Sequence, residues 1–277
     1  MRYGFVFMLV IGCGGDDTVG GSSGGTDGSG GSGGSVTGTG GSTDSTADAS
    51  TGASTDASTS GTCTGAGGSG GTGTGGSDID PFAPRRIWTI GDSITGGTVT
   101  YRTTLWQRVT GAGIPLDMLG SHEMGPAELP DRDTDGYGGY RIDEWAVGLD
   151  AYATAAVDPT DVLGLLGTND MANGDGVWGT TAEAPDRLQA LVLDIQAYHP
   201  TARYWIGTLP PSTSLTVGPR IDLYNPALPG VAVSVGATLV DIHAALTPAD
   251  IGPDKIHPTP GGYIEIGNTW ADALGMP

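Results

Sequence analysis

The chain has 277 residues, 51 of them glycine, and a formal net charge of −20. From residue 78 onward it carries 25 acidic and 10 basic residues. This balance argues against nucleic acid as a partner, because nucleic-acid binding needs a basic face, and it disfavours adsorption to anionic lipid. An acidic surface of this kind primarily serves solubility.

The first 13 residues have the pattern of a targeting signal. Arg2 precedes a short apolar run that ends in Val10-Ile11-Gly12-Cys13. The run is too short to span a bilayer, and the layout is typical of a secretory signal. Its last four residues resemble the lipobox of bacterial lipoproteins, which implies that Cys13 is lipidated. We therefore expect an extracytoplasmic, lipid-anchored cell-envelope or secreted bacterial protein that meets the membrane only through this anchor.

A linker and a single domain are expected after the signal. Residues 14–77 are almost entirely Gly, Ser, Thr, Ala and Asp. Such a composition buries too little apolar surface to offset its ordering entropy, so we expect disorder, with a root-mean-square span of roughly 45 Å. Residues 78–277 suffice for one domain with a sizeable core. Cys63 lies in the linker, so no disulfide is expected in the fold, and we expect a monomer.

Apolar runs and amphipathic stretches alternate along this domain. Strands are predicted at residues 87–90, 116–119, 161–166, 203–208 and 238–242, and helices at 100–111, 141–157, 184–199 and 260–274. Residues 121–139 are predicted as a long polar loop. Because strands alternate with helices, we predict the α/β class: a three-layer α/β/α sandwich with a mostly parallel five-stranded sheet.

Polar residues of complementary chemistry follow three of the predicted strands. Ser93 follows the first strand, Asn169 the third, and the pair Asp254 and His257 the fifth. These positions share one edge of a parallel sheet. A serine hydroxyl becomes a nucleophile when a base such as histidine takes its proton, and an aspartate can orient that histidine. The amide of Asn169 is a suitable donor to a developing oxyanion.

Other polar candidates carry weaker signals. Asp131, Asp133 and Asp135 imitate the first half of a calcium loop, but Ile142 stands where the bidentate glutamate belongs, so we interpret the segment as a solvated acidic loop and expect neither metal nor organic cofactor. The remaining histidines are expected in structural or surface roles: His122, His199 and His243. Trp145 lies on an apolar helix face and is expected in the core.

Two further residues are candidate substrate contacts. Trp178 lies in a glycine-rich loop after Asn169, where its ring could stack on a sugar. Asp92, within Gly91-Asp92-Ser93, is the second candidate.

Four sequence blocks resemble those of the SGNH (GDSL-type) hydrolases, in that family's order. They are Gly91-Asp92-Ser93, Gly139, Gly167-Thr168-Asn169-Asp170 and Asp254-Lys255-Ile256-His257-Pro258. The resemblance spans residues 85–275 and implies a flavodoxin-like SGNH hydrolase fold. It implies that Ser93 is the nucleophile, His257 the general base and then acid, and Asp254 the orienting acid. The implied oxyanion hole consists of the Ser93 and Gly139 backbone N–H groups and the Asn169 side chain.

The second block requires a choice among three glycines. Gly136, Gly138 and Gly139 lie close together, and the family pattern aligns best with Gly136 and Gly139. The other common serine-hydrolase signature, Gly-x-Ser-x-Gly, is not met, because Thr95 stands at its last position.

Within that clan the chain most resembles carbohydrate esterase family three, the acetyl xylan esterase type. The similar segments include Ile90-Gly91-Asp92-Ser93-Ile94-Thr95, Leu119-Gly120-Ser121, Ile221-Asp222-Leu223-Tyr224-Asn225 and Gly261-Gly262-Tyr263. The resemblance implies removal of acetyl groups from carbohydrate such as xylan. The alternatives are a lipid esterase, lysophospholipase or thioesterase of the same clan, and, from another class, a non-catalytic surface carbohydrate-binding module.

Overall fold

A computed structural model describes residues 83–176 and 179–276. Cys13, the segment 14–77 and Trp178 lie outside the described residues, so the anchor, the linker and the Trp178 contact stay predictions. Among the described residues, no helix combines the length and apolarity needed to cross a membrane.

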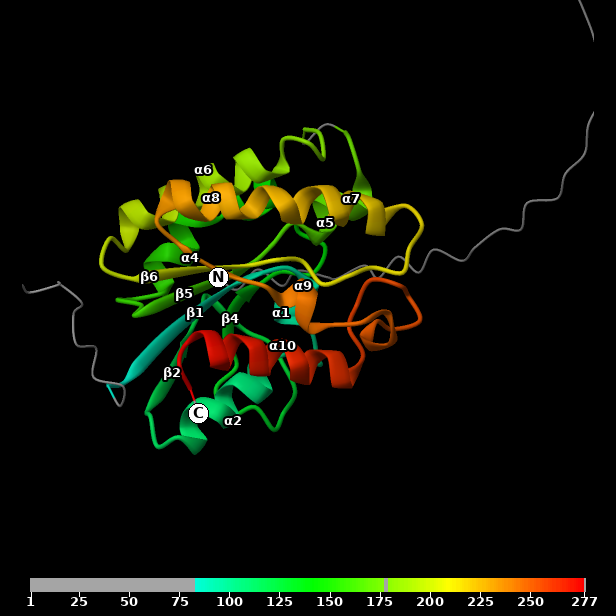
Figure 1. Ribbon diagram of the computed structural model, residues 1–277. Helices are drawn as coiled ribbons and strands as arrows, with labels where there is room; N and C mark the ends of the chain where they lie inside the picture. The colour runs from blue at the N-terminus through cyan, green and yellow to red at the C-terminus, as the bar shows by residue number, and fades with distance from the viewer. Residues whose placement is uncertain (1–82, 177–178, 277) are drawn as a thin grey trace, which may run out of the picture. The chain divides into compact units, whose positions relative to one another are not determined.

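One sheet organises the described part of the chain (Figure 1). Its strands are β1 (Arg85–Gly91), β2 (Leu116–Leu119), β3 (His122–Glu123), β4 (Asp133–Gly136), β5 (Asp161–Leu165), β6 (Arg203–Gly207) and β7 (Thr238–Val240). They run in the order β3-β4-β1-β5-β6-β7, with β2 also paired to β1. Every pair is parallel except β3 with β4. The five predicted strands and the parallel sheet are confirmed.

The expected strand count is wrong, because residues 121–139 are not only a loop. β2 and β4 pair with the same edge of β1, one after the other along the strand. β2 pairs with Arg85–Trp88, and β4 pairs with Ile90 and Gly91. The sequence of β4 is Asp-Thr-Asp-Gly, which has no apolar alternation. It is buried through polar contacts instead, so a hydrophobic pattern could not reveal it.

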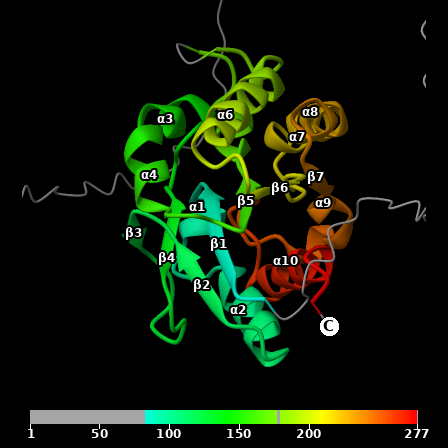
Figure 2. The same cartoon turned by 90° about the vertical axis from the view of Figure 1, so that its left-hand side faces the viewer.

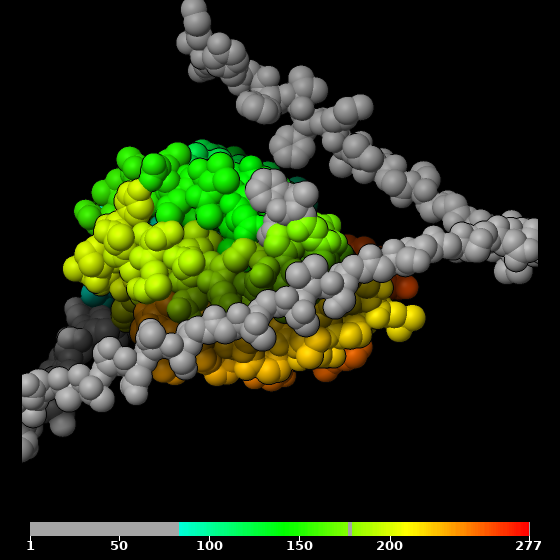
Figure 3. All heavy atoms as spheres, turned by 90° about the horizontal axis from the view of Figure 1, so that it is seen from above, coloured from blue at the N-terminus to red at the C-terminus, as the bar shows by residue number. Residues whose placement is uncertain are grey.

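Helices cover both faces of the sheet. They are α1 (Ser93–Gly96), α2 (Arg102–Gly111), α3 (Ile142–Val147), α4 (Leu149–Ala155), α5 (Thr168–Asn173), α6 (Ala184–Tyr198), α7 (Val217–Tyr224), α8 (Leu228–Val235), α9 (Ile242–Ala245) and α10 (Pro260–Ala273), with 3₁₀ turns η1 (Asn225–Ala227) and η2 (Pro248–Asp250). α4, α6 and α8 lie on one face, and α2 and α10 on the other (Figures 1 and 2). The surface of the α6 and α8 layer is seen in Figure 3. The three-layer architecture is confirmed.

The helix predicted at 141–157 is two helices. Gly148 separates α3 from α4, and the Tyr152 ring lies against it so closely that a β-carbon there would meet ring atoms at 2.1–2.3 Å. Because it has no side chain, Gly148 allows the Tyr152 ring to pack at the point where α3 ends and α4 begins. Trp145 of α3 is fully buried, with its ring centroid 5.9 Å from that of Trp88 on β1, which confirms its place in the core.

A buried carboxylate connects β4 to the core. Asp135 is fully buried, and its Oδ2 accepts a hydrogen bond from the indole N–H of Trp88 at 2.6 Å. Its Oδ1 accepts from the backbone N–H of Ser121 at 3.1 Å and from the Tyr137 hydroxyl at 2.9 Å. A buried acceptor that satisfies several donors holds a polar strand in place, because each of those donors would otherwise be buried without a partner.

We predict that Asp135→Ala lowers the free energy of unfolding by about 3 kcal/mol, since it leaves the Trp88 indole and its neighbours without an acceptor. Urea unfolding followed by tryptophan fluorescence measures this change. Asp133→Ala is the matched control on the same strand, because Asp133 is only half-buried. Equal losses in the two variants would contradict the role given to Asp135.

Candidate active site

Ser93, His257 and Asp254 converge at the carboxyl edge of the sheet. Ser93 begins α1 directly after β1, and its Oγ lies 2.7 Å from His257 Nε2. The other ring nitrogen, Nδ1, lies 2.6 Å from Asp254 Oδ2. The three side chains thus form a continuous hydrogen-bonded chain from carboxylate to hydroxyl. This is the geometry in which a histidine can take the serine proton while a carboxylate fixes its tautomer.

The Asp254 carboxylate is kept ionised by its own turn. Partial burial opposes ionisation, but hydrogen bonds from the Ile256 N–H and from the His257 ring and backbone outweigh it and lower the pKa of Asp254. Asp254 Oδ1 accepts the Ile256 and His257 N–H groups at 3.1 and 3.0 Å. The carboxylate therefore supports a positively charged imidazole during proton transfer.

The turn that carries His257 is fixed to the rest of the domain. Lys255 has a left-handed φ of +70°, and its carbonyl accepts from Ser212 Oγ at 2.6 Å and from the Thr213 N–H at 3.1 Å. The Gly252 N–H donates to the His257 carbonyl at 2.7 Å. The imidazole is thus positioned by contacts with the segment that follows β6, far away in the sequence.

The side chain of Asp92 is buried rather than exposed beside Ser93. Its side chain is 0 % exposed and caps α1 by accepting the Ile94 N–H at 2.9 Å. This burial argues against the expected substrate contact, because the carboxylate points inward and fixes the start of the helix that presents Ser93. Burial raises the pKa of Asp92 to about 6.

The structure narrows the choice among the three glycines of the second block. The Gly136 N–H donates to Thr134 Oγ1 at 3.2 Å, and a β-carbon on Gly136 would meet the Gly96 backbone, so this glycine serves strand packing. Within the described residues, the backbone N–H groups of Ser93, Gly138 and Gly139 have no protein acceptor. Gly139 has a φ of +83°, which favours glycine. These N–H groups remain free to bind an oxyanion.

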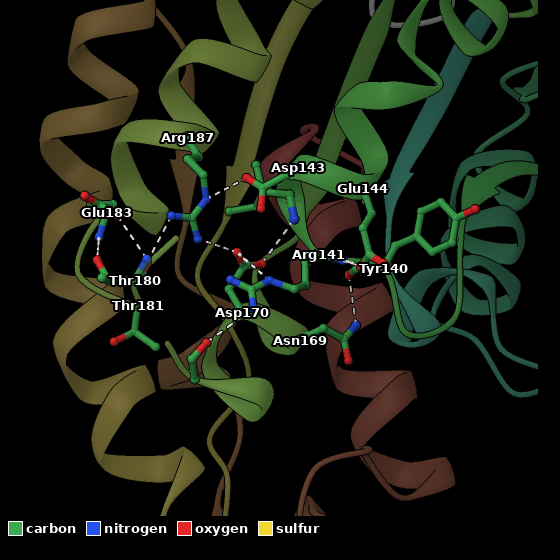
Figure 4. A network of polar contacts seen from close by, with 12 residues as sticks. Tyr140, Arg141, Asp143, Glu144, Asn169, Asp170, Thr180, Thr181, Glu183 and Arg187 are labelled. Atoms are coloured by element: carbon green, nitrogen blue, oxygen red, sulfur yellow. Dashed lines mark hydrogen bonds and ion pairs between the residues drawn. The ribbon is translucent and has the colours of Figure 1, made fainter. Parts of the chain in front are cut away.

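Asn169 is held beside that glycine loop. It lies in the first turn of α5, and its Nδ2 donates to the Tyr140 carbonyl at 3.0 Å (Figure 4). This bond uses one amide hydrogen and leaves the second available to an oxyanion. This hydrogen bond therefore fixes the orientation of the Asn169 side chain relative to the loop that carries Gly139.

A buried ion-pair network reinforces this connection and was not foreseen from the sequence (Figure 4). Asp170 is fully buried; its Oδ2 accepts the Ile142 N–H at 3.1 Å, and its Oδ1 accepts from Arg187 at 2.7 Å. Arg141 Nε lies 3.7 Å from the same carboxylate. The one signal in the sequence is that Asp170 follows Asn169 directly. Its pairing with Arg187 of α6 depends on tertiary structure.

The acidic segment of residues 131–135 does not gather around a cation position. Asp131 accepts the Met118 and Asp133 N–H groups, at 2.8 and 3.2 Å, and Asp135 is committed to Trp88 and its neighbours. Within residues 83–176 and 179–276, no cluster of three or more potential ligands is placed to hold a metal ion. The interpretation of a solvated loop is also wrong for Asp135, which is a buried structural acceptor.

The remaining histidines make structural contacts. His199 lies 3.1 Å from the Ala153 carbonyl, and His243 Nδ1 lies 3.0 Å from the Leu209 carbonyl. The His122 ring packs on Tyr137 with 4.5 Å between ring centroids. None of these contacts reaches Ser93.

The buried Asp92 carboxylate predicts a pH-dependent stability difference. Its pKa of about 6 in the folded protein exceeds the ordinary value of 3.8. Ionisation of Asp92 therefore lowers the stability of the folded state as the pH rises from 4 to 6, and the full cost is present above pH 6. We expect Asp92→Asn to exceed the wild type in unfolding free energy by about 3 kcal/mol at pH 7.5, and by much less at pH 4.5. Urea unfolding at the two pH values checks this.

Asp241→Asn is the control for that measurement, because Asp241 also caps a short helix but is solvent-exposed. Removing its charge relieves little burial cost. A stability difference for Asp92→Asn that does not grow with pH would contradict the assignment.

Asn169→Ala is expected to lower kcat by 100- to 1000-fold with little change in KM, because a donor to the oxyanion acts mainly in the transition state. Asp170→Asn should lower kcat about tenfold, since it loosens the element that orients Asn169. Steady-state kinetics on an ester substrate measures both. Asp143→Asn is the control, because Asp143 binds Arg187 at 2.8 Å without contacting Asn169. A loss seen in KM alone would contradict this role.

Comparison with known proteins finds esterases that share this fold. The family 3 carbohydrate esterase of Clostridium thermocellum is 27% identical, with a TM-score of 0.60 over 69% of this chain and 98% of its own. A family 3 esterase of Talaromyces cellulolyticus is 21% identical, with a TM-score of 0.60 over 69% and 96%. Axe2, an acetylxylan esterase of Geobacillus stearothermophilus, is 16% identical, with a TM-score of 0.56 over 71% and 97%.

A search of curated proteins found no match to this chain. The sequence model described as the GDSL-like Lipase/Acylhydrolase family matches residues 89–263, more than half of the chain, and this span contains Ser93, Asn169 and His257. The chain therefore belongs to the GDSL-like lipase/acylhydrolase (SGNH) family of ester hydrolases.

Proposed function

We propose that this protein is a serine esterase that removes acetyl groups from carbohydrate such as xylan. The observation that carries the proposal is the hydrogen-bonded chain from Asp254 through His257 to Ser93, beside free backbone N–H groups. The similarity to the family 3 carbohydrate esterase of Clostridium thermocellum, at 27% identity, supports carbohydrate as the alcohol part of the ester.

The reaction proceeds in two steps. Ser93 Oγ attacks the acetyl carbonyl carbon while its proton passes to His257 Nε2, and the N–H groups of Ser93 and Gly139 with the Asn169 amide bind the oxyanion. When the intermediate collapses, the sugar oxygen leaves with the proton of His257. Water then attacks the acetyl-enzyme, gives a proton to His257 and releases acetate, and Ser93 recovers its proton. Asp254 stabilises the imidazolium in both steps.

The surroundings of Ser93 favour a short acyl group. The segment that follows β5 and α5 is rich in glycine and polar residues, and the loop that follows β6 is rich in threonine, serine and proline, whereas a long acyl chain needs an extended apolar groove. This argues against a lipid esterase or a long-chain thioesterase. A non-catalytic binding module would not require the nucleophile and base, and this chain has both at hydrogen-bond distance.

The N-terminal pattern supports a location for this activity. We propose that Cys13 carries a lipid anchor and that residues 14–77 tether the esterase outside the cytoplasm. A tether of this length would let the enzyme reach polymer at a distance from the membrane surface. Loss of membrane association in Cys13→Ala, with activity retained, is the expected result.

Acetate release from acetylated xylan, other acetylated glycans and deacylated phospholipid tests the activity. We expect release from the glycans by the wild type, and a loss of at least 1000-fold in Ser93→Ala. p-Nitrophenyl acetate should be hydrolysed faster than p-nitrophenyl octanoate. A preference for octanoate would favour the lipid alternative, and a wild type inactive on every ester would favour the binding module.

A further inference from the structure

A second cavity continues the one that contains the nucleophile. The first has a volume of about 310 Å³ and is lined by Ser93, Gly97, Thr98, Val99, His257, Pro258, Pro260 and Tyr263. The second, of about 260 Å³, shares Thr98, Val99, Pro260 and Tyr263 with it and extends to Thr103, Thr104 and Gln107 of α2 and to Glu128. Because they share these four residues, the two cavities are adjacent, and we refer to them together as the groove that leads from Ser93 across the first turns of α2 and α10.

The groove presents polar groups that the protein itself leaves unused. Within the described part of the chain, no hydrogen bond is made by the side chains of Thr98, Thr104, Gln107 and Glu128 or by the Tyr263 hydroxyl. Thr103 Oγ1 also has no partner, but it is buried and is not exposed to the groove. Several donors and acceptors that face one concave surface can bind a ligand rich in hydroxyl groups.

Apolar surface lies between these polar groups. Val99 is 47 % exposed and Ile264 is 50 % exposed, although both are aliphatic. Pro126 and Pro260 add rigid apolar faces to the same lining. A sugar ring has the matching composition, because its C–H faces are apolar and its hydroxyls are polar.

The groove lies on the side of Ser93 where the alcohol must leave. His257 gives its proton to the departing oxygen, so that oxygen sits within hydrogen-bond distance of Nε2. His257 and the following Pro258 line the groove, whereas Gly139 and Asn169, the candidate oxyanion donors, do not. The cavity therefore accommodates the alcohol part of the ester rather than the acyl part.

We propose that this groove is a binding site for a neutral oligosaccharide, holding the sugar residues that adjoin the acetylated one. The proposal rests on the proposed carbohydrate esterase function. It adds where the sugar residues next to the acetylated one bind. The one charged residue of the far lining is Glu128, and neither lysine nor arginine lines either cavity. A neutral glycan fits this lining, and an anionic headgroup does not. Gln107 and Glu128 determine the preference for longer chains.

The test compares kcat/KM for singly acetylated xylose with that for singly acetylated xylotetraose and cellotetraose. We expect the wild type to prefer at least one tetrasaccharide by about tenfold, chiefly through KM, because the groove binds sugars that do not react. The double variant Gln107→Ala, Glu128→Ala should bring this ratio close to one. Thermal unfolding of each variant checks that the fold is retained.

Matched controls separate this effect from general surface changes. Gln189→Ala lies on α6, in the opposite helical layer, and Glu265→Ala lies on α10 outside the groove lining. Both should keep the wild-type ratio. An equal fall of the ratio in these controls would overturn the assignment of Gln107 and Glu128.

The outcomes also separate the groove from the esterase function. If the wild type hydrolyses acetylated xylose and both tetrasaccharides with the same kcat/KM, the groove proposal is overturned and the esterase function stands. If the wild type releases no acetate from xylose, either tetrasaccharide or p-nitrophenyl acetate, the proposed function fails and the groove proposal fails with it.

Discussion

The hydrogen bond between Ser93 Oγ and His257 Nε2 joins two residues that are 164 positions apart in the chain. A contact of such separation exists only because parallel strands end at one edge of the sheet, where the loops that follow them meet. β1 and the helix start after it fix the serine, and the turn before α10 fixes the imidazole. The sheet thereby brings the three side chains together from loops that lie far apart in the sequence.

Polar groups buried in this molecule hold the elements that carry the site. Asp92 caps the helix that presents Ser93, Asp135 ties β4 to Trp88, and Asp170 joins α5 to the start of α3. Each of these three carboxylates lies in a polar segment, whose position apolar packing alone would not fix. Burying a carboxylate is costly unless donors satisfy it. Both oxygens of Asp135 and of Asp170 accept hydrogen bonds, whereas Oδ2 of Asp92 is buried without a partner, and burial raises the pKa of Asp92.

The two sides of Ser93 have different surroundings. Backbone N–H groups and the Asn169 amide lie toward the second sequence block, where the proposed reaction places the negative charge of the carbonyl oxygen. The groove lined by His257, Tyr263 and residues of α2 lies toward the leaving group. Because the first side is built mainly from backbone and the second from side chains, substitutions in the groove can change specificity while the chemistry at Ser93 stays the same.

The sequence by itself indicated which side chains have the chemistry of a catalytic site. It also indicated the positions of five strands, because each of those strands is an apolar run. Ser93, Asn169 and His257 could be selected as candidates because a hydroxyl, an amide and an imidazole each follow a predicted strand, and these groups suit a nucleophile, an oxyanion donor and a base. β4 could not, because its Asp-Thr-Asp-Gly sequence is buried through hydrogen bonds and close backbone contacts rather than by apolar side chains.

Tertiary structure alone decided that Asp92 points inward, that Gly136 serves packing while the Gly139 N–H stays free, and that Asp170 pairs with Arg187. It also decided which side of Ser93 opens into a groove. The physical reason is the same in each case. A local pattern reports which face of an element is apolar, whereas the partner of a buried polar group is supplied by a segment distant in the sequence.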